Sequence, residues 1–154
     1  MLYMEKLSAK SLQIGDWVQI IEPCKYAGAI GRIKTLIDHK DDESAYFKVF
    51  LRSNTIHIGI EDICSDDIRP IPLTPEILEK NGFEMVSDKN GVPIYRIKWP
   101  INRDYYFSVW TGLDGYWNPV GFGVTIGGVQ GDVDYVHQLQ HALKLCGIEK
   151  EIEL

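Results

Sequence analysis

Cysteine and long apolar runs are both scarce in this chain of 154 residues. Its three cysteines, Cys24, Cys64 and Cys146, lie far apart and form no Cys-x-x-Cys pair. Neither an even disulfide framework nor a zinc knuckle fits them, so we expect a reduced, cytoplasmic protein. The first residues show no signal-peptide pattern, and no run approaches the roughly 20 apolar residues of a transmembrane helix. We therefore expect a soluble, non-exported protein without a membrane partner.

Basic charge is scarce as well. Sixteen Lys and Arg residues face twenty-two Asp and Glu residues, which gives a formal net charge of −6. Residues 1–72 contain nine basic and eleven acidic side chains, and residues 73–154 contain seven and eleven. A negative surface opposes nonspecific attraction to phosphate backbones. A nucleic-acid partner is possible but disfavoured, since it requires a local basic patch.

Catalytic signatures are missing. The sequence contains no Gly-x-Ser-x-Gly elbow and no Gly-Lys-Ser/Thr of a P-loop. Gly121, Gly123 and Gly127 miss the dinucleotide-binding spacing by one residue, and no βαβ pattern surrounds them. We interpret this segment as a turn between strands and a loop that leads to the last helix, and we expect no enzyme and no cofactor.

A weak metal pattern is present in "HQLQH". His137 and His141 have the i, i+4 spacing that chelates zinc on one helical face. A metalloprotease helix needs Glu directly after the first His, where this chain has Gln138, and no third ligand is evident. Both His fall on the predicted solvent face, so we expect a solvated pair and no native metal site.

Strand patterns dominate residues 12–72. Short β-branched or aromatic runs alternate with turn material, and five of them are candidates for strands: "LQIGDWVQII", "AIGRIKTLI", "AYFKVFL", "TIHIGI" and "DIRPIP". Five short strands separated by such turn segments predict a small antiparallel barrel.

The pattern changes at residues 71–74, which we take as the domain boundary. Thr74 is a candidate N-cap, Pro75 suits the first helical position, and Asn81-Gly82 is a stop signal, so a short helix follows. An Asn-Gly turn at 90–91 then predicts a hairpin. Further strands are expected within 105–113 and near 122–126.

The chain closes with a predicted amphipathic helix over "DYVHQLQHALKLCG", with Asp134 as its cap and Gly147 as its stop. The fold class we expect is mainly β with an α+β C-terminal part. We expect residues 1–72 to form the small antiparallel β-barrel, and residues 73–154 to form a short helix, an antiparallel sheet of three or four strands and a C-terminal helix.

Two resemblances follow from these segments. The stretches "GDWVQI", "YAGAIGRI" and "IEDICSDDIRPIP" resemble the KOW motif and the wider SH3-like small barrels, which occur in ribosomal proteins, transcription factors and protein-binding adaptors. The stretches "IRPIPLTPEILEKNGF" and "YVHQLQHALKLCG" resemble uncharacterised small proteins of gut-bacterial genomes, prophages and mobile elements. The first resemblance implies a fold, and the second implies a phage-related setting without an activity.

Aromatic density is the most informative feature. Nine of the seventeen aromatic residues lie within residues 95–122. Strand alternation places Tyr106 and Trp110 on one face, and Arg96 and Lys98 also share a face. The candidate partner-binding residues are Tyr106, Trp110, Arg96, Lys98, Arg103 and Trp99.

This combination of aromatic and basic side chains is compatible with three functions. The first is non-enzymatic binding, as an adaptor with a protein partner. The second is weak binding of single-stranded nucleic acid through the aromatic and basic sheet face. The third is a small-ligand site, or an unrecognised enzyme, in a cleft between the two modules. The sequence leaves the oligomeric state open.

Overall fold

The computed structural model describes residues 12–21, 27–37, 46–52, 60–64, 67–102 and 104–154. The chain divides into two compact units, Met1–Ile71 and Pro72–Leu154. Both units contain an antiparallel sheet, and the two helices of the described residues belong to the second unit, so the predicted mainly β class is confirmed. None of the helices within the described residues is long and apolar enough to span a bilayer.

The described residues of the first unit form five antiparallel strands in the order β4-β3-β2-β1-β5. Their bounds are Trp17–Ile20 for β1, Ile30–Ile37 for β2, Tyr46–Arg52 for β3, Ile60–Cys64 for β4 and Ile68–Pro70 for β5. The strand expected at "TIHIGI" lies mostly outside the described residues, and β4 begins at its last residue. Within the described part of this unit no ladder joins β4 to β5, so the sheet is open there.

The described core of this unit comes from β1, β2, β5 and the segment before β1. Its buried apolar side chains are Leu12, Trp17, Val18, Ile20, Ile33 and Ile68. The Arg32 guanidinium lies 4.5 Å from the centroid of the Trp17 ring, a cation–π contact between neighbouring strands. Gly28 has a φ of 84°, which explains why the turn into β2 needs a glycine.

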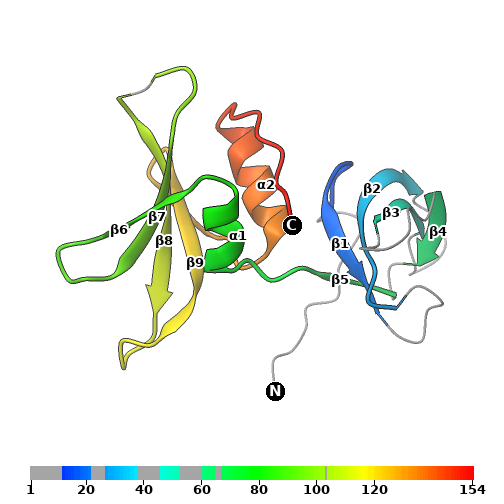
Figure 1. The fold of residues 1–154 in the computed structure, drawn as a ribbon, viewed down its shortest axis with the longest axis horizontal. Helices are drawn as coiled ribbons and strands as arrows, with labels where there is room; N and C mark the ends of the chain where they lie inside the picture. The colour runs from blue at the N-terminus through cyan, green and yellow to red at the C-terminus, as the bar shows by residue number, and fades with distance from the viewer. Residues whose placement is uncertain (1–11, 22–26, 38–45, 53–59, 65–66, 103) are drawn as a thin grey trace. The chain divides into compact units, whose positions relative to one another are not determined.

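The second unit contains five strands in the order β10-β9-β8-β7-β6 (Figure 1). Their bounds are Glu84–Ser87 for β6, Pro93–Lys98 for β7, Tyr106–Leu113 for β8, Pro119–Ile126 for β9 and Val129–Asp132 for β10. The prediction of three or four strands is therefore wrong, because β10 was interpreted as a loop. Gly127 and Gly128, with φ of 57° and 82°, turn the chain back directly after β9. All four β10 residues are exposed, so no apolar alternation marked the strand.

The first helix, α1 (Pro75–Lys80), begins and ends where the sequence predicts. The Thr74 hydroxyl accepts the Ile77 N–H at 3.3 Å, Pro75 occupies the first turn, and Gly82 follows the C-cap with a φ of 81°. These local signals agree with the observed bounds of the helix.

The second helix, α2 (Val136–Leu145), ends near Gly147 as predicted, with a φ of 69° at that glycine. The predicted cap at Asp134 is wrong, because Tyr135 is the N-cap residue. Asp134 Oδ1 accepts the N–H of Phe122 in β9 at 3.1 Å instead. The Asp134 carboxylate, which the sequence predicts as the cap of the helix, therefore bonds the sheet instead.

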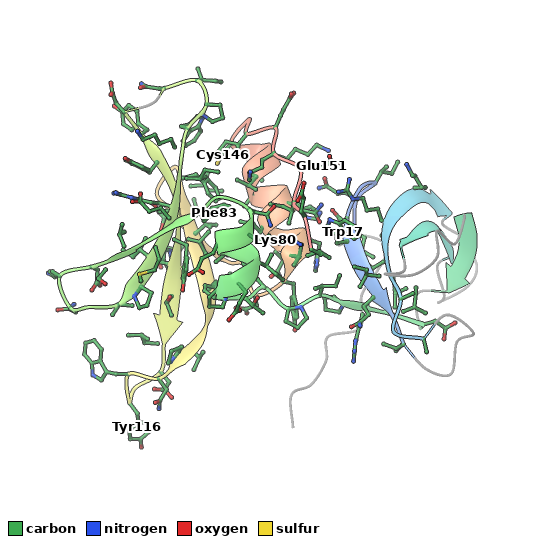
Figure 2. All side chains as sticks on the ribbon, in the orientation of Figure 1. Trp17, Lys80, Phe83, Tyr116, Cys146 and Glu151 are labelled. Atoms are coloured by element: carbon green, nitrogen blue, oxygen red, sulfur yellow. The ribbon has the colours of Figure 1, made fainter. Side chains whose placement is uncertain are left out.

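Both helices lie on one side of the second sheet (Figure 1). The apolar core of this unit joins strands and helices; its main buried members are Leu78, Tyr95, Phe107, Val109, Leu139 and Leu143. Phe83 lies beside α1 (Figure 2), with its ring centroid 6.4 Å from that of Phe107 in an edge-to-face arrangement. Burial and the neighbouring Glu79 and Glu76 of α1 raise the pKa of Tyr95. Each fully buried apolar side chain contributes about 1.5–3 kcal/mol to folding.

The last residues of the chain are fastened to α1 through one buried amide. Asn81 is 5% exposed, and its side chain both accepts the Glu153 N–H and donates to the Glu153 carbonyl, each at 2.8 Å. The same amide nitrogen donates to the Ile77 carbonyl at 2.8 Å. Ile152, 1% exposed, is buried one residue before this clamp. Asn81 therefore couples the segment after α2 to the end of α1.

Replacing Asn81 by alanine should destabilise the protein. Asn81→Ala removes all three of these hydrogen bonds and leaves the Glu153 backbone groups without their partner, at a cost of about 2 kcal/mol. Urea denaturation followed by tryptophan fluorescence measures the loss. Asn90→Ala, at an exposed turn position, is the matched control and should change stability by less than about 0.5 kcal/mol. Equal stabilities of the two variants would contradict the clamp.

Candidate functional site

The face of the second sheet that points away from the helices carries most of the predicted site residues. Directly opposite residues on neighbouring strands share a face, and three registers define this one: Lys98 with Tyr106, Trp110 with Gly123, and Gly123 with Asp132. Arg96 lies two residues before Lys98 and joins them. We call this surface, made by Arg96, Lys98, Tyr106, Trp110, Gly123 and Asp132, the Trp110 face.

Alternation along β8 separates the two faces of the sheet. Phe107 and Val109 are 4% and 0% exposed and belong to the helix-covered core, whereas Tyr106 is 38% exposed. Trp110 is half-buried although neither α1 nor α2 lies on its side of the sheet (Figure 1). Its cover must come from the sheet itself.

Gly123 supplies that cover. A Cβ at this position would overlap the Cζ2, Cη2 and Cε2 atoms of the Trp110 ring. A Cβ on Gly112, two residues further along β8, would lie 3.7 Å from Cζ3 of the same ring. The six-membered ring of the indole therefore lies on the bare backbone of β9, which fixes its orientation while leaving its outer side half open.

Arg96 is held in a similar way. Its guanidinium carbon lies 4.2 Å from the centroid of the Tyr106 ring, and its Nε lies 3.5 Å from Glu84 Oε2, a long and exposed ion pair. Stacking on the ring holds the guanidinium against the sheet. Lys98, directly opposite Tyr106, is exposed and adds a second positive charge beside the stack.

Charge on this side of the sheet is mixed. Arg96 and Lys98 lie on β7, while Glu84 lies opposite Arg96 on β6 and Asp132 lies at the β10 edge. The two positive and two negative groups balance formally. The face is therefore aromatic and polar, without a single-sign electrostatic field.

The structure places four of the six predicted residues together: Tyr106, Trp110, Arg96 and Lys98. Trp99 follows β7, and its N–H donates to the Tyr105 carbonyl at 2.9 Å, so strand alternation puts its side chain on the opposite face. Arg103 lies outside the described residues.

The predicted solvated histidine pair is wrong for His137. This residue is 4% exposed, stacked on Tyr135 with ring centroids 6.0 Å apart, and its ring meets that of His141 edge-on at 5.7 Å. The stacked Tyr135 ring, just before the helix, covers a position that helical periodicity alone assigned to solvent. Among the described residues, no group of three His, Cys, Asp or Glu side chains is placed to hold a metal ion. Cys146, at the end of α2, is partly buried, and this burial raises the pKa of its thiol.

Sequence reasoning missed the β8–β9 hairpin tip. Tyr116 and Trp117 are 87% and 68% exposed, Trp117 has a φ of 66°, and Figure 2 shows Tyr116 pointing away from the sheet. The Asp114 carboxylate accepts the backbone N–H of Asn118 at 3.0 Å and that of Tyr116 at 2.8 Å. These bonds lower the pKa of Asp114 and hold the tip in one turn conformation.

Sequence reasoning also missed the role of Gly123, although a signal was present. Gly121 and Gly123 alternate along one strand, so a single face of that strand lacks side chains there. A large aromatic on the neighbouring strand is the expected occupant of such a surface.

Comparison with known proteins adds no relative: no protein-family model, no curated protein and no solved structure matches the chain.

The contact between Trp110 and Gly123 predicts a strong coupling between the two positions. Gly123→Ala must displace the indole and should cost about 1–3 kcal/mol of stability. In a Trp110→Ala background the same methyl group meets no ring, so the cost should disappear and Gly123→Ala should stabilise the strand by up to about 1 kcal/mol. Urea denaturation of the four proteins of this double-mutant cycle measures the difference. Additive effects of the two substitutions would contradict the contact.

Proposed function

We propose that the protein is a non-enzymatic binding protein that engages a protein partner through the Trp110 face. The observation that carries the proposal is the indole of Trp110 seated on Gly123, beside Arg96 stacked on Tyr106. Trp, Tyr and Arg are the residue types that dominate protein–protein hot spots. Because the sheet already holds these side chains in place, little rotamer entropy is lost when a partner binds.

Charge supports a protein partner over nucleic acid. Phosphate binding draws its affinity from clustered Lys and Arg, and here Glu84 lies beside Arg96 while residues 73–154 carry more acidic than basic groups. A mixed surface around an aromatic centre is typical of protein interfaces, which have an apolar core and a polar rim.

The first unit fits the same interpretation as an SH3-like barrel. Strand β1 pairs with β2 on one side and with β5 on the other, so β5 lies beside β1, a strand order that supports the barrel interpretation although β4 and β5 are not paired within the described residues. The resemblance to SH3-like modules, which occur in protein-binding adaptors, supports a role of this protein as an adaptor. The proposal also includes a cytoplasmic location, which rests on cysteine content alone, and a phage-related setting, which rests on sequence resemblance alone. A ligand site between the two modules stays a prediction.

Site-specific photo-crosslinking in cells that naturally contain the protein tests the partner. Thr125 is exposed on the same side of the sheet as Trp110, two residues beyond Gly123 along β9, and would be replaced by benzoylphenylalanine. The expected result is a discrete protein adduct that Trp110→Ala reduces by at least about tenfold and that Tyr116→Ala leaves unchanged. The same probe at exposed Glu149 is the control. An adduct that forms equally from Glu149, or that survives Trp110→Ala, would sink the proposal.

Binding of single-stranded nucleic acid is the second candidate, because Arg96 and Lys98 flank an aromatic ring. This function predicts affinity for short labelled RNA or DNA that falls steeply from about 20 to about 200 mM salt and weakens on Arg96→Ala and on Lys98→Ala. Fluorescence anisotropy measures it. A flat titration at the lower salt, where charge is least screened, removes this function and leaves the protein partner.

A further inference from the structure

The chain contains two Lys-Asn-Gly triplets, which the fold places in different surroundings. They are residues 80–82 at the end of α1 and residues 89–91 in the turn between β6 and β7. The glycine backbone is closely similar at the two sites. Gly82 and Gly91 have φ of 81° and 79°, and each donates its N–H at 3.0 Å to the carbonyl three residues earlier. The main difference between the two sites lies in the asparagine side chains.

An Asn-Gly pair is the sequence in which asparagine loses its side-chain amide most readily. The glycine nitrogen bonds to the side-chain Cγ of the asparagine and gives up its proton, while the bond from Cγ to the amide nitrogen breaks and ammonia leaves. Water then opens the five-membered succinimide ring at one of its two carbonyls. The product is aspartate, or isoaspartate when the main chain continues through the side chain. Glycine favours this reaction because it has no side chain to obstruct the ring and its backbone rotates freely.

The side chain of Asn81 is held away from this reaction. Asn81 is 5% exposed, its amide nitrogen donates to the carbonyls of Ile77 and Glu153, and its amide oxygen accepts the Glu153 N–H, each at 2.8 Å. The amide has to rotate before the glycine nitrogen can reach Cγ, and this rotation breaks all three bonds. Reaction at Asn81 therefore requires local unfolding of the clamp between α1 and the last residues of the chain.

The side chain of Asn90 has no such restraint. Asn90 is exposed, and no group among the described residues forms a hydrogen bond with its side-chain amide. The turn is held through its backbone, because Asp88 Oδ1 accepts the N–H of Asn90 at 2.7 Å and that of Val92 at 2.9 Å, and the Asp88 carbonyl accepts the Gly91 N–H. These bonds lie at the exposed end of a hairpin, where the backbone opens without unfolding of the core.

We propose that Asn90 is a site of spontaneous deamidation in the folded protein and that the fold protects Asn81 from the same reaction. The two Lys-Asn-Gly triplets are equivalent by sequence, so the selection comes from the surroundings of the two amides. Water is the only other reactant, and the proposed binding partner is not required.

Deamidation changes the turn between β6 and β7 in two ways. Both products carry one new carboxylate, so the formal net charge of −6 becomes −7, and the added charge lies two residues from Asp88. Isoaspartate also inserts a methylene group into the main chain of the turn. This extra length disturbs the bonds from Gly91 and Val92 to Asp88, which close the hairpin beside the pair of Ser87 and Pro93. We therefore expect isoaspartate at position 90 to weaken this end of the hairpin.

Peptide mapping of the full chain tests the selection. The folded protein is incubated at mildly alkaline pH and then digested with pepsin at low pH, where deamidation is slow. Cleavage beside Phe83 separates the two triplets, and mass spectrometry measures the exchange of each amide for a carboxyl group. Asn90 should convert at least about tenfold faster than Asn81, because opening the clamp breaks three hydrogen bonds of a buried amide.

The same chain unfolded in concentrated urea is the matched control. Both triplets are then open, and their rates should agree within about threefold. Asn90→Gln, whose cyclisation needs a larger ring, should remove the conversion at position 90 and leave the rate at Asn81 unchanged. Equal rates at Asn81 and Asn90 in the folded protein would overturn the proposal, as would an Asn90 that reacts in urea but stays intact in the folded protein. A preference for Asn90 that persists undiminished in urea would also overturn it, because the fold would then not be its cause.

Discussion

The second sheet carries aromatic side chains on both faces, but the two helices cover only one of them. The covered face buries Tyr95, Phe107 and Val109 against α1 and α2. On the other face neither α1 nor α2 packs on Trp110, and an indole without support there would expose its apolar surface to water. The arrangement of this face follows from that constraint.

Gly123 meets the constraint at a local cost. A glycine within a strand weakens it by roughly 0.5–1 kcal/mol relative to alanine, because the unfolded chain has more freedom to lose. The indole covers the bare backbone, which restores apolar contact and explains why Trp110 is half-buried on an open face. Arg96 repeats the same solution on β7 by stacking on Tyr106. Both side chains are thereby ordered before any partner arrives, which is the physical basis of the proposed binding function.

Capping residues and strand alternation in the sequence predicted the elements that depend on neighbouring residues, such as α1 and β8. Thr74 and Gly82 bound α1, and alternation along β8 assigned Tyr106 and Trp110 to the face opposite Phe107. The failures share a tertiary cause. Asp134 bonds the backbone of β9 and not the helix that it precedes, and the ring of Tyr135 covers His137. Strand β10 carries exposed side chains throughout, so its identity depends on the ladder with β9 and not on a hydrophobic pattern.

The most direct measurement of the central claim, that Trp110 is seated on Gly123, is the proton NMR spectrum of Gly123. A proton held under the face of an indole is shielded by its ring current. The account predicts Gly123 Hα resonances far upfield of the usual glycine position, with nuclear Overhauser contacts to Hζ2 and Hη2 of Trp110, and a return to ordinary shifts in Trp110→Ala. Ordinary Gly123 shifts in the unmodified protein, without those contacts, would show that the indole is not seated there and would remove the preorganised face on which the proposed function depends.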